Sequence, residues 1–384
     1  MQISNYNLLE RIAQAPGTSL AQLDLSPEEI NELEQYHRHG IIGHESSQAK
    51  LTTRFVDGKY RAQYEGMDTT WFFHVPQKME VDITTQCNFK CIHCGRDASP
   101  GKQQGTMRLE DYIELIERAA DIGVTSLTVM GGEPTSHPEF IELALMARVA
   151  GIRDLSTSTN GWLVDEAMAE KMVQLFSSVQ VSIHGCSAQT HDAIVSRPGA
   201  FERAKNAVRL LLKHGVKSLN TSFTVMRLNA QEMAGMVNLS RELGVPNMRF
   251  LVLSPEGRAL DMDMWSDEER ENLAELIGDW RRGQCGSMEI TAGGFPPYDG
   301  ISTSSAYYGC PAGRSLLYVD AFGKAKPCHC TSMELGDVRD TPLLDLWHQP
   351  ALMDIRKRLT CCNYSEVCSG GCLGNSLWAD KFQS

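Results

Sequence analysis

The chain has 384 residues, of which 42% are hydrophobic and 22% charged, a composition typical of a soluble globular protein with more than one folded unit. The formal net charge of −12 argues against nucleic acid as a partner, because phosphate-binding surfaces need clustered Lys and Arg. No run approaches the ~20 apolar residues of a membrane span, and the N-terminus lacks the pattern of a signal peptide. The sequence therefore predicts a cytoplasmic protein with no membrane partner.

Cysteine is concentrated in two parts of the chain. Three of the twelve cysteines lie between Cys87 and Cys94, and seven lie between Cys310 and Cys372. Stable disulfides are unexpected in the reducing cytoplasm, so this clustering indicates metal or redox chemistry. Two groups of metal ligands are expected.

Residues 1–66 have the pattern of a small helical unit with a polar ribbon around 50–56, which is typical of a winged-helix-like module. Ser26, Pro27 and Glu29 match the N-cap, first-turn proline and third-position acid of a helix start. Acidic residues outnumber Lys and Arg in this segment. A peptide or a neighbouring domain is therefore a better candidate partner for it than DNA.

Residues 76–255 alternate short β-rich runs with amphipathic helical runs. Strands are predicted over 79–85, 125–130, 153–159, 179–185, 218–225 and 248–253. Helices are predicted over 108–123, 138–151, 165–176, 200–215 and 230–244. A repeated βα unit predicts a parallel sheet. The expected fold class is α/β, a partial (β/α)6 TIM-like barrel with its active site at the carboxyl ends of the strands.

The rest of the chain divides into a bridging segment, 256–309, and a small cysteine-rich domain, 310–384. The bridge contains a predicted helix whose capping box is Ser266 and Glu269. The tail combines a hairpin candidate over 315–328 with a helical stretch over 341–359 and a final run of cysteines. Because its apolar residues are few, we expect bound metal to hold this domain together.

Cys87, Cys91 and Cys94 follow directly on the first predicted strand and share one short loop. Iron–sulfur clusters are bound by Cys thiolates, so three ligands leave one iron of a [4Fe–4S] cluster open. The alternative is a zinc knuckle, which needs a fourth ligand, and His93 beside Cys94 is poorly placed to supply it. The CxxxCxxC spacing and its position after the first barrel strand resemble the radical S-adenosylmethionine (SAM) superfamily.

That resemblance implies that SAM binds the open iron and is cleaved, by an electron from the cluster, to a 5′-deoxyadenosyl radical that abstracts a substrate hydrogen. An electron donor such as flavodoxin or ferredoxin is then needed. Gly131, Gly132, Glu133 and Pro134 follow the second predicted strand and resemble the family loop that holds the methionine amino group. Glu133 is the expected acceptor for the ammonium group.

Further cofactor contacts are implied at the strand ends. By the same resemblance, Thr159, Asn160, Ser182 and Arg197 contact the ribose and carboxylate of SAM, and His93 lies near its adenine. Arg197 suits a carboxylate because its planar fork can donate two hydrogen bonds. Ordinary capping and turn roles are the alternative for each strand-end residue, and a solvated loop position is the alternative for His93.

The tail resembles the auxiliary-cluster extension called SPASM or, in its shorter form, twitch. The positions that carry this resemblance are Cys310, Cys328, Cys362, Cys368 and Cys372. The full form has a further cysteine where this chain has Leu359, and another beyond Cys372. The resemblance therefore implies one auxiliary [4Fe–4S] cluster, with Cys310, Cys328 and Cys372 as ligands and Cys368 or Cys362 as the fourth. A structural zinc site on the same thiols is the alternative.

Three functions remain open from the sequence. The leading hypothesis is a peptide maturase that introduces a cross-link, an epimer or an oxidised residue, with the N-terminal module capturing a leader peptide. The second is a radical SAM enzyme acting on a small molecule, for example by decarboxylating or dehydrogenating a tetrapyrrole. The third is an iron–sulfur redox-sensing winged-helix regulator. Cys186, after the fourth strand, is either a hydrogen-atom donor or a small filler residue.

Overall fold

The computed structural model describes residues 75–101, 107–283, 288–295 and 311–360, together with Ser26 and the N-terminal stretches 42–43, 50–56, 59–65 and 72–73. The predicted N-terminal helices, including Pro27 and Glu29, lie outside the described residues, as do all the predicted cysteine ligands of the tail except Cys328. None of the helices in the described part of the chain is long and apolar enough to cross a membrane.

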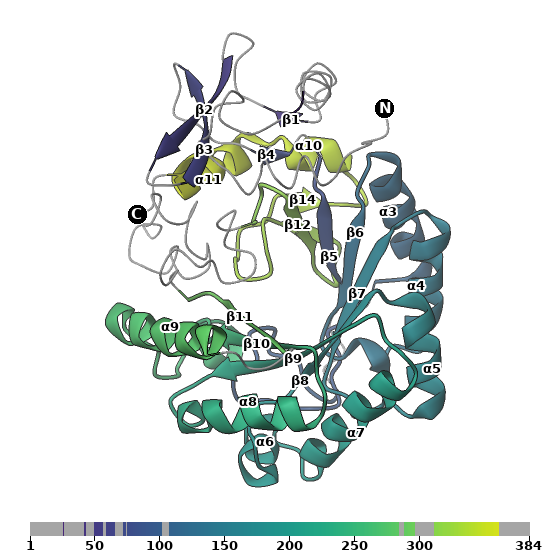
Figure 1. Ribbon diagram of the computed structural model, residues 1–384. Coiled ribbons are helices and arrows are strands. Elements are labelled where there is room, and N and C mark those ends of the chain that lie inside the picture. The colour runs from purple at the N-terminus through teal and green to yellow at the C-terminus, as the bar shows by residue number, and fades with distance from the viewer. Residues whose placement is uncertain are drawn as a thin grey trace.

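One ten-stranded sheet organises the described part of the chain (Figure 1). Its order is β11-β10-β9-β8-β7-β6-β5-β12-β13-β14, and the neighbours from β11 to β12 run parallel. The strands are β5 (Lys78–Asp82), β6 (Ser126–Met130), β7 (Asp154–Thr159), β8 (Ser178–Ser182), β9 (Ser218–Val225), β10 (Asn247–Val252), β11 (Glu289–Gly293), β12 (Leu316–Val319), β13 (Lys324–Lys326) and β14 (Gly336–Asp337). Strands β5 to β10 confirm the predicted partial barrel.

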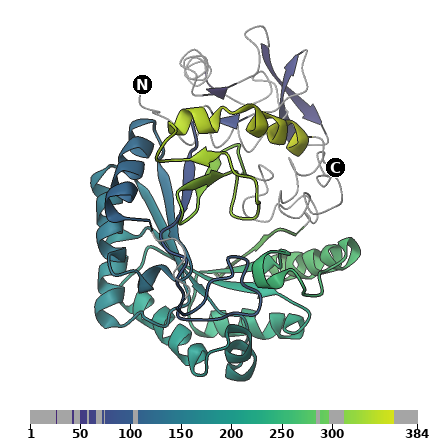
Figure 2. The same cartoon turned by 180° about the vertical axis from the view of Figure 1, so that it is seen from behind.

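Helices cover the outer face of this curved sheet (Figures 1 and 2). They are α3 (Leu109–Asp121), α4 (Phe140–Val149), α5 (Glu166–Leu175), α6 (Ala188–Val195), α7 (Ala200–Lys213), α8 (Met233–Glu242) and α9 (Asp267–Arg282), with α10 (Leu343–Trp347) and α11 (Pro350–Thr360) at the other end of the sheet. Helix α6 was not predicted. Its local signal is Ser187, whose hydroxyl caps the helix by accepting the N–H of Thr190.

Side chains alternate between the two faces of the sheet. On β10, Met248 and Phe250 are fully buried towards the helices, whereas Arg249 between them faces the inside of the barrel. The inner face carries hydroxyl and amide groups that hydrogen-bond from strand to strand. The measured pairs are Thr128 with Ser156 at 2.8 Å, Gln180 with Ser158 at 3.2 Å, Asn220 with Ser178 at 3.1 Å, and Ser222 with Ser182 at 3.3 Å. The barrel therefore has an apolar outer layer and a polar lumen.

Both flanking segments add strands to the barrel. Strand β11, from the predicted bridge, pairs with β10, and β12, from the tail, pairs with β5. The predicted capping box is present at Ser266 and Glu269, and the predicted hairpin forms from β12 and β13. The single helical stretch expected over 341–359 is two helices, because Pro350 has no backbone N–H and begins a new one.

The described part of the tail packs into the barrel core, although the sequence predicted a segment held mainly by metal. Leu317 and Trp347 are fully buried in the same apolar cluster as the barrel strands. Arg356 is also buried, and its guanidinium donates to the carbonyl of Gly313 and to that of Trp347 at 2.8 Å. Burial of apolar surface therefore stabilises this part of the chain.

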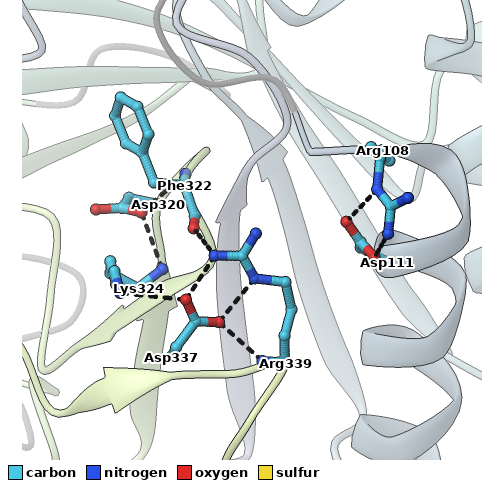
Figure 3. A network of polar contacts seen from close by, with 7 residues as sticks. All are labelled: Arg108, Asp111, Asp320, Phe322, Lys324, Asp337 and Arg339. Atoms are coloured by element: carbon cyan, nitrogen blue, oxygen red, sulfur yellow. Dashed lines mark hydrogen bonds and ion pairs between the residues drawn. The ribbon is translucent and has the colours of Figure 1, made fainter.

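An exposed ion-pair network fastens the turns of the tail hairpin beside helix α3 (Figure 3). Asp337 accepts hydrogen bonds from the backbone N–H and guanidinium of Arg339, and from Lys324 at 3.1 Å. Arg339 also donates to the carbonyl of Phe322 at 2.9 Å. Arg108 and Asp111 form a second, separate ion pair at the start of α3. Each surface ion pair of this kind contributes little to the free energy of folding. The network therefore aligns the hairpin more than it stabilises it.

The N-terminal strands form two small antiparallel pairs. Strand β2 (Lys50–Val56) pairs along its whole length with β3 (Lys59–Glu65), which confirms the predicted ribbon. Strand β1 (Ile42–Gly43) pairs with β4 (Phe72–Phe73). In both views the β2–β3 ribbon lies at the end of the molecule that carries α10 and α11.

Replacing Leu317 with Ala tests whether the tail strand β12 belongs to the barrel core. We expect the free energy of unfolding to fall by about 2–5 kcal/mol, because a fully buried leucine leaves a cavity. The measurement is urea denaturation followed by circular dichroism. The control Leu276→Ala changes a leucine that is 40% exposed and should stay within about 0.5 kcal/mol of the wild type. Equal effects of the two substitutions would contradict a shared core.

Candidate active site

The three clustered cysteines lie on the loop between β5 and α3. The Cys87 sulfur accepts the N–H of Phe89 at 3.3 Å, and the N–H of Cys94 donates to the carbonyl of Cys91 at 3.3 Å. Phe89 is 2% exposed and anchors the loop in a small apolar cluster at the end of α6. Its ring has Trp162 as an edge-on neighbour at 5.7 Å. These contacts hold the loop in its conformation.

Burial and neighbouring negative charge raise the pKa values of these thiols. Burial, with Glu133 adding to it, raises the pKa of Cys87 to about 12, and burial together with Cys87 and Cys94 raises the pKa of Cys91 further. Thiolates in such a place need a cationic group to stabilise them. Within the described residues, no three His, Cys, Asp or Glu side chains converge on the position of one metal ion. Three cysteines on one loop are the donor set that a [4Fe–4S] cluster with one open iron would use.

Arg258 clamps the cysteine loop from the far edge of the barrel. Its guanidinium donates to the carbonyls of Cys91 and Ala98 and to the carboxylate of Asp97, each at 2.7 Å. Its backbone N–H donates to the carbonyl of Cys94 at 3.0 Å. Gly257 makes this approach possible, because a Cβ there would lie 2.4 Å from a loop carbonyl. Sequence analysis missed Arg258, since no motif links it to cysteines more than 160 residues earlier.

The Gly131–Gly132 turn touches the start of the cysteine loop. The N–H groups of Gly132 and Glu133 donate to the carbonyls of Thr84 and Gln86, both at 2.8 Å. A Cβ on Gly132 would lie 2.0 Å from the Gln86 carbonyl oxygen, so only glycine fits. The two loops predicted to hold the cofactor are therefore built against each other.

Glu133 has a different immediate role from the one expected. It is 1% exposed, and its carboxylate accepts hydrogen bonds from the N–H and hydroxyl of Thr135, the hydroxyl of Thr159 and the N–H of Asn160. Burial nevertheless raises its pKa. With four protein donors already in place, Glu133 ties the turn to the end of β7, and its contact with an ammonium group stays a prediction.

Asn160 and Ser182 face the same edge of the barrel. The Asn160 amide donates to the side chain of Asn88, next to Cys87, at 2.7 Å. Ser182 ends β8 and accepts a hydrogen bond from Ser222. Pro134 is buried in the short 3-10 turn Pro134–Ser136 that follows Glu133. These positions agree with the predicted cofactor edge, and their contacts with SAM stay predictions.

Arg197 and His93 make contacts that the sequence did not show. Arg197 is exposed, and its guanidinium lies 4.5 Å from the ring centre of Trp162. The His93 ring meets His184 edge-on at 4.4 Å, and the backbone N–H of His184 donates to His191. Burial lowers the pKa of His93 to about 4, so this ring is neutral near pH 7. His93 is therefore a packed ring, not a solvated loop residue.

Cys186 does not point into the lumen. Its sulfur lies against α8, where a Cβ on Gly235 would come within 2.7 Å of it. Its backbone N–H donates to Glu232 at 2.6 Å, and burial with the nearby Glu232 raises the thiol pKa to about 11. This position contradicts a hydrogen-atom donor and supports the filler alternative.

The predicted auxiliary site is described only in part. Cys328 is 7% exposed within the main core, and Cys330 is partly buried beside it. The remaining candidates, Cys310, Cys362, Cys368 and Cys372, lie outside the described residues. Between the two described cysteines, His329 reaches the lumen and lies 3.3 Å from Glu80. The choice of a fourth ligand stays a prediction.

Two buried polar atoms near the cysteine loop have no hydrogen-bond partner: Nδ2 of Asn88 and Nδ1 of His93. Buried polar atoms are normally satisfied, so this pair marks a place where a polar ligand is missing. Both atoms belong to residues adjacent to a loop cysteine. The thiols and the unpaired atoms together fit a cluster with a polar cofactor against it.

Family comparison agrees with this geometry. A family model described as the radical SAM superfamily matches residues 81–239, and one described as an iron–sulfur cluster-binding domain, of the SPASM type, matches residues 310–373. Together they span more than half of the chain. The chain belongs to the radical SAM superfamily. It is an enzyme of the radical SAM type that binds a [4Fe–4S] cluster and SAM. Its SPASM domain binds auxiliary iron–sulfur clusters.

Relatives and solved structures are similar over most of the chain. An AdoMet-dependent heme synthase from Methanosarcina barkeri is 27% identical over 326 residues, covering 77% of this chain and 91% of that protein. The mycofactocin maturase MftC from Mycolicibacterium smegmatis is 27% identical over 312 residues, covering 76% of each. Streptococcus suis SuiB bound to S-adenosylmethionine has the same fold, with a TM-score of 0.65, 16% identity, and coverage of 93% of this chain and 81% of SuiB.

Replacing Gly132 with Ala tests the contact between the two radical SAM loops. We expect the reconstituted protein to lose about four irons per chain and the SAM-dependent change in the electron paramagnetic resonance of the reduced cluster, because the new Cβ displaces Gln86. Gly95→Ala, in the facing cysteine loop, is the matched control, because a Cβ there would lie 3.4 Å from its nearest neighbour. Normal cluster assembly in the Gly132 variant would contradict the close contact.

Replacing Arg258 tests the clamp across the barrel. Arg258→Gln removes charge-assisted bonds to the loop, so release of the radical SAM cluster to an iron chelator should accelerate by about tenfold or more. The release rate of the Arg258→Lys variant should lie between those of Arg258→Gln and the wild type. The control Arg227→Lys breaks an equivalent two-bond pair with Glu269 outside the site and should leave the release rate unchanged.

Proposed function

We propose that this radical SAM enzyme modifies a peptide, and that the N-terminal ribbon holds that peptide as an added strand. Among the described strands, β2 and β3 pair only with each other, and the outer edge of each is paired with no other described strand. An extended peptide can dock on such an edge through main-chain hydrogen bonds. This unpaired edge is the observation that carries the proposal.

The comparisons support a peptide in two ways. The structure of SuiB bound to S-adenosylmethionine superposes on 93% of this chain. SuiB has also been solved bound to its precursor peptide SuiA, with a TM-score of 0.64 and 16% identity to this chain over 79% of it and 73% of SuiB. MftC, by its name, is a maturase.

The chain's own residues prepare the lumen for this reaction. Cys87, Cys91 and Cys94 would hold the cluster, and the edge formed by Glu133 and Asn160 would orient SAM beside it. The bound group supplies one-electron chemistry that removes a hydrogen atom from the substrate. The polar inner face would position the substrate, and the strands β11 and β12 extend the sheet on either side. A flavodoxin- or ferredoxin-like donor in the cytoplasm is the proposed source of electrons.

A small-molecule substrate is the second candidate, and the heme synthase relative favours it. By name that enzyme makes heme, so a tetrapyrrole with carboxylate side chains is the matching substrate class. A lumen lined with hydroxyl and amide groups is compatible with such a molecule. The regulator considered from the sequence is set aside, because the family is enzymatic.

Comparing the intact chain with one that lacks residues 1–66 separates the two candidates. Peptides encoded beside the gene, and an iron tetrapyrrole bearing propionates, are offered anaerobically with SAM and reductant. For a peptide, KM for the truncated chain should rise about 100-fold with kcat little changed, because tethering of the leader is lost. Substrate-free formation of 5′-deoxyadenosine by both chains is the control. Equal kcat/KM on a peptide, or turnover of the tetrapyrrole alone, would sink the peptide proposal.

A further inference from the structure

Arg249 is an unpaired cation inside the barrel. It occupies the third position of β10, between the outward-facing Met248 and Phe250. Its Nε atom is buried without a hydrogen-bond partner, and no described residue accepts a hydrogen bond from its guanidinium. The residue as a whole is partly buried, and arginine keeps its charge at any physiological pH, so an anion beside the guanidinium would offset the desolvation of its Nε.

The nearest acid is already engaged. Glu80, on β5 across the lumen, attracts Arg249 only at a distance. Its own carboxylate accepts from Lys78 at 3.0 Å and lies 3.3 Å from His329. The other charged pair in the lumen is that of Asp82, whose Oδ2 accepts from Arg96 and from the hydroxyl of Tyr318, both at 2.6 Å, while its Oδ1 has no hydrogen-bond partner. Arg249 alone lacks such a partner among these lumen residues.

The surroundings of Arg249 form a receptor for an anion. Gly293 on β11 leaves room for the guanidinium, since a Cβ there would lie 3.2 Å from its terminal nitrogen. Strand register places Ser222 and Thr291 on either side of Arg249, and Ser182 beyond Ser222. A row of hydroxyl groups therefore extends from the arginine along the inner face of the sheet.

We propose that Arg249 binds a carboxylate of the substrate and so sets which part of the substrate faces the cofactor edge. A planar guanidinium donates two parallel hydrogen bonds to a carboxylate, and the neighbouring hydroxyls can complete its coordination. A monoanion is favoured over a phosphate, because Glu80 and Asp82 repel additional negative charge. For a peptide the ligand is an acidic side chain or a C-terminus, and for a tetrapyrrole it is a propionate.

The position of Arg249 favours the substrate over the carboxylate of SAM. The cysteine loop, the Gly131–Gly132 turn and Asn160 follow β5, β6 and β7, whereas Arg249 lies on β10, three strands beyond β7 in the sheet. It thus lies on a strand separate from those that carry the cofactor edge. The inference rests on the proposed function only in placing the substrate in this lumen.

The test uses the reconstituted holoenzyme and propionate as the probe, without turnover. Thermal unfolding is followed in sodium propionate and, at equal ionic strength, in sodium chloride with neutral propionamide. We expect propionate to raise the melting temperature of the wild type and of the surface control Arg241→Met, but not that of Arg249→Met. The rise for Arg249→Lys should lie between those of the wild type and Arg249→Met. Without propionate, Arg249→Met should melt a few degrees higher than the wild type, because a buried unpaired charge is removed.

Equilibrium dialysis of SAM distinguishes the two sources of carboxylate. If Arg249 serves the substrate, Arg249→Met binds SAM as tightly as the wild type does, and propionate still stabilises the SAM-bound wild type. A tenfold loss of SAM affinity in Arg249→Met, or loss of the propionate effect when SAM is bound, would assign the arginine to the cofactor. A propionate response that persists in Arg249→Met would also overturn the proposal. None of these results depends on finding the substrate of the proposed function.

Discussion

The close approach of two backbones at one edge of the barrel is the constraint on which the site depends. The Gly131–Gly132 turn lies so near Thr84 and Gln86 that side chains are excluded, and backbone hydrogen bonds join the two loops. Glu133 then ties the turn to the end of β7, and Arg258 ties the cysteine loop to the segment after β10. Four strand ends are thereby locked in one arrangement, so the cluster and cofactor meet a site that is already shaped.

The side chains that face the lumen differ in polarity from those of the outer layer of the barrel. Parallel strands usually carry apolar side chains on both faces, because both faces are covered. Here the outer face is apolar, while the inner face carries hydroxyls, amides and charged pairs such as Asp82 with Arg96. Hydrogen bonds between neighbouring strands satisfy most of these groups. In our proposal, a polar substrate lies against this face and Arg249 orients it.

The tail is part of this lumen as well as the carrier of auxiliary ligands. Strand β12 pairs with β5 and contributes Tyr318, whose hydroxyl donates to Asp82. His329, one residue after Cys328, reaches Glu80 on the same strand. A residue next to a predicted auxiliary ligand thus contacts the inner face of the barrel directly.

Local patterns in the sequence determined the cysteine loop, the six strands from β5 to β10, the capped helix at Ser266 and the ribbon at 50–56, because each depends on neighbours close in the chain. Other features depended on tertiary contacts between distant residues. These include the clamp by Arg258, the pairing of β11 and β12 with the barrel, the packing of Cys186 against α8 and the unpaired charge of Arg249. No spacing rule connects such residues, since only closure of the barrel brings them together and decides which polar groups remain without a partner.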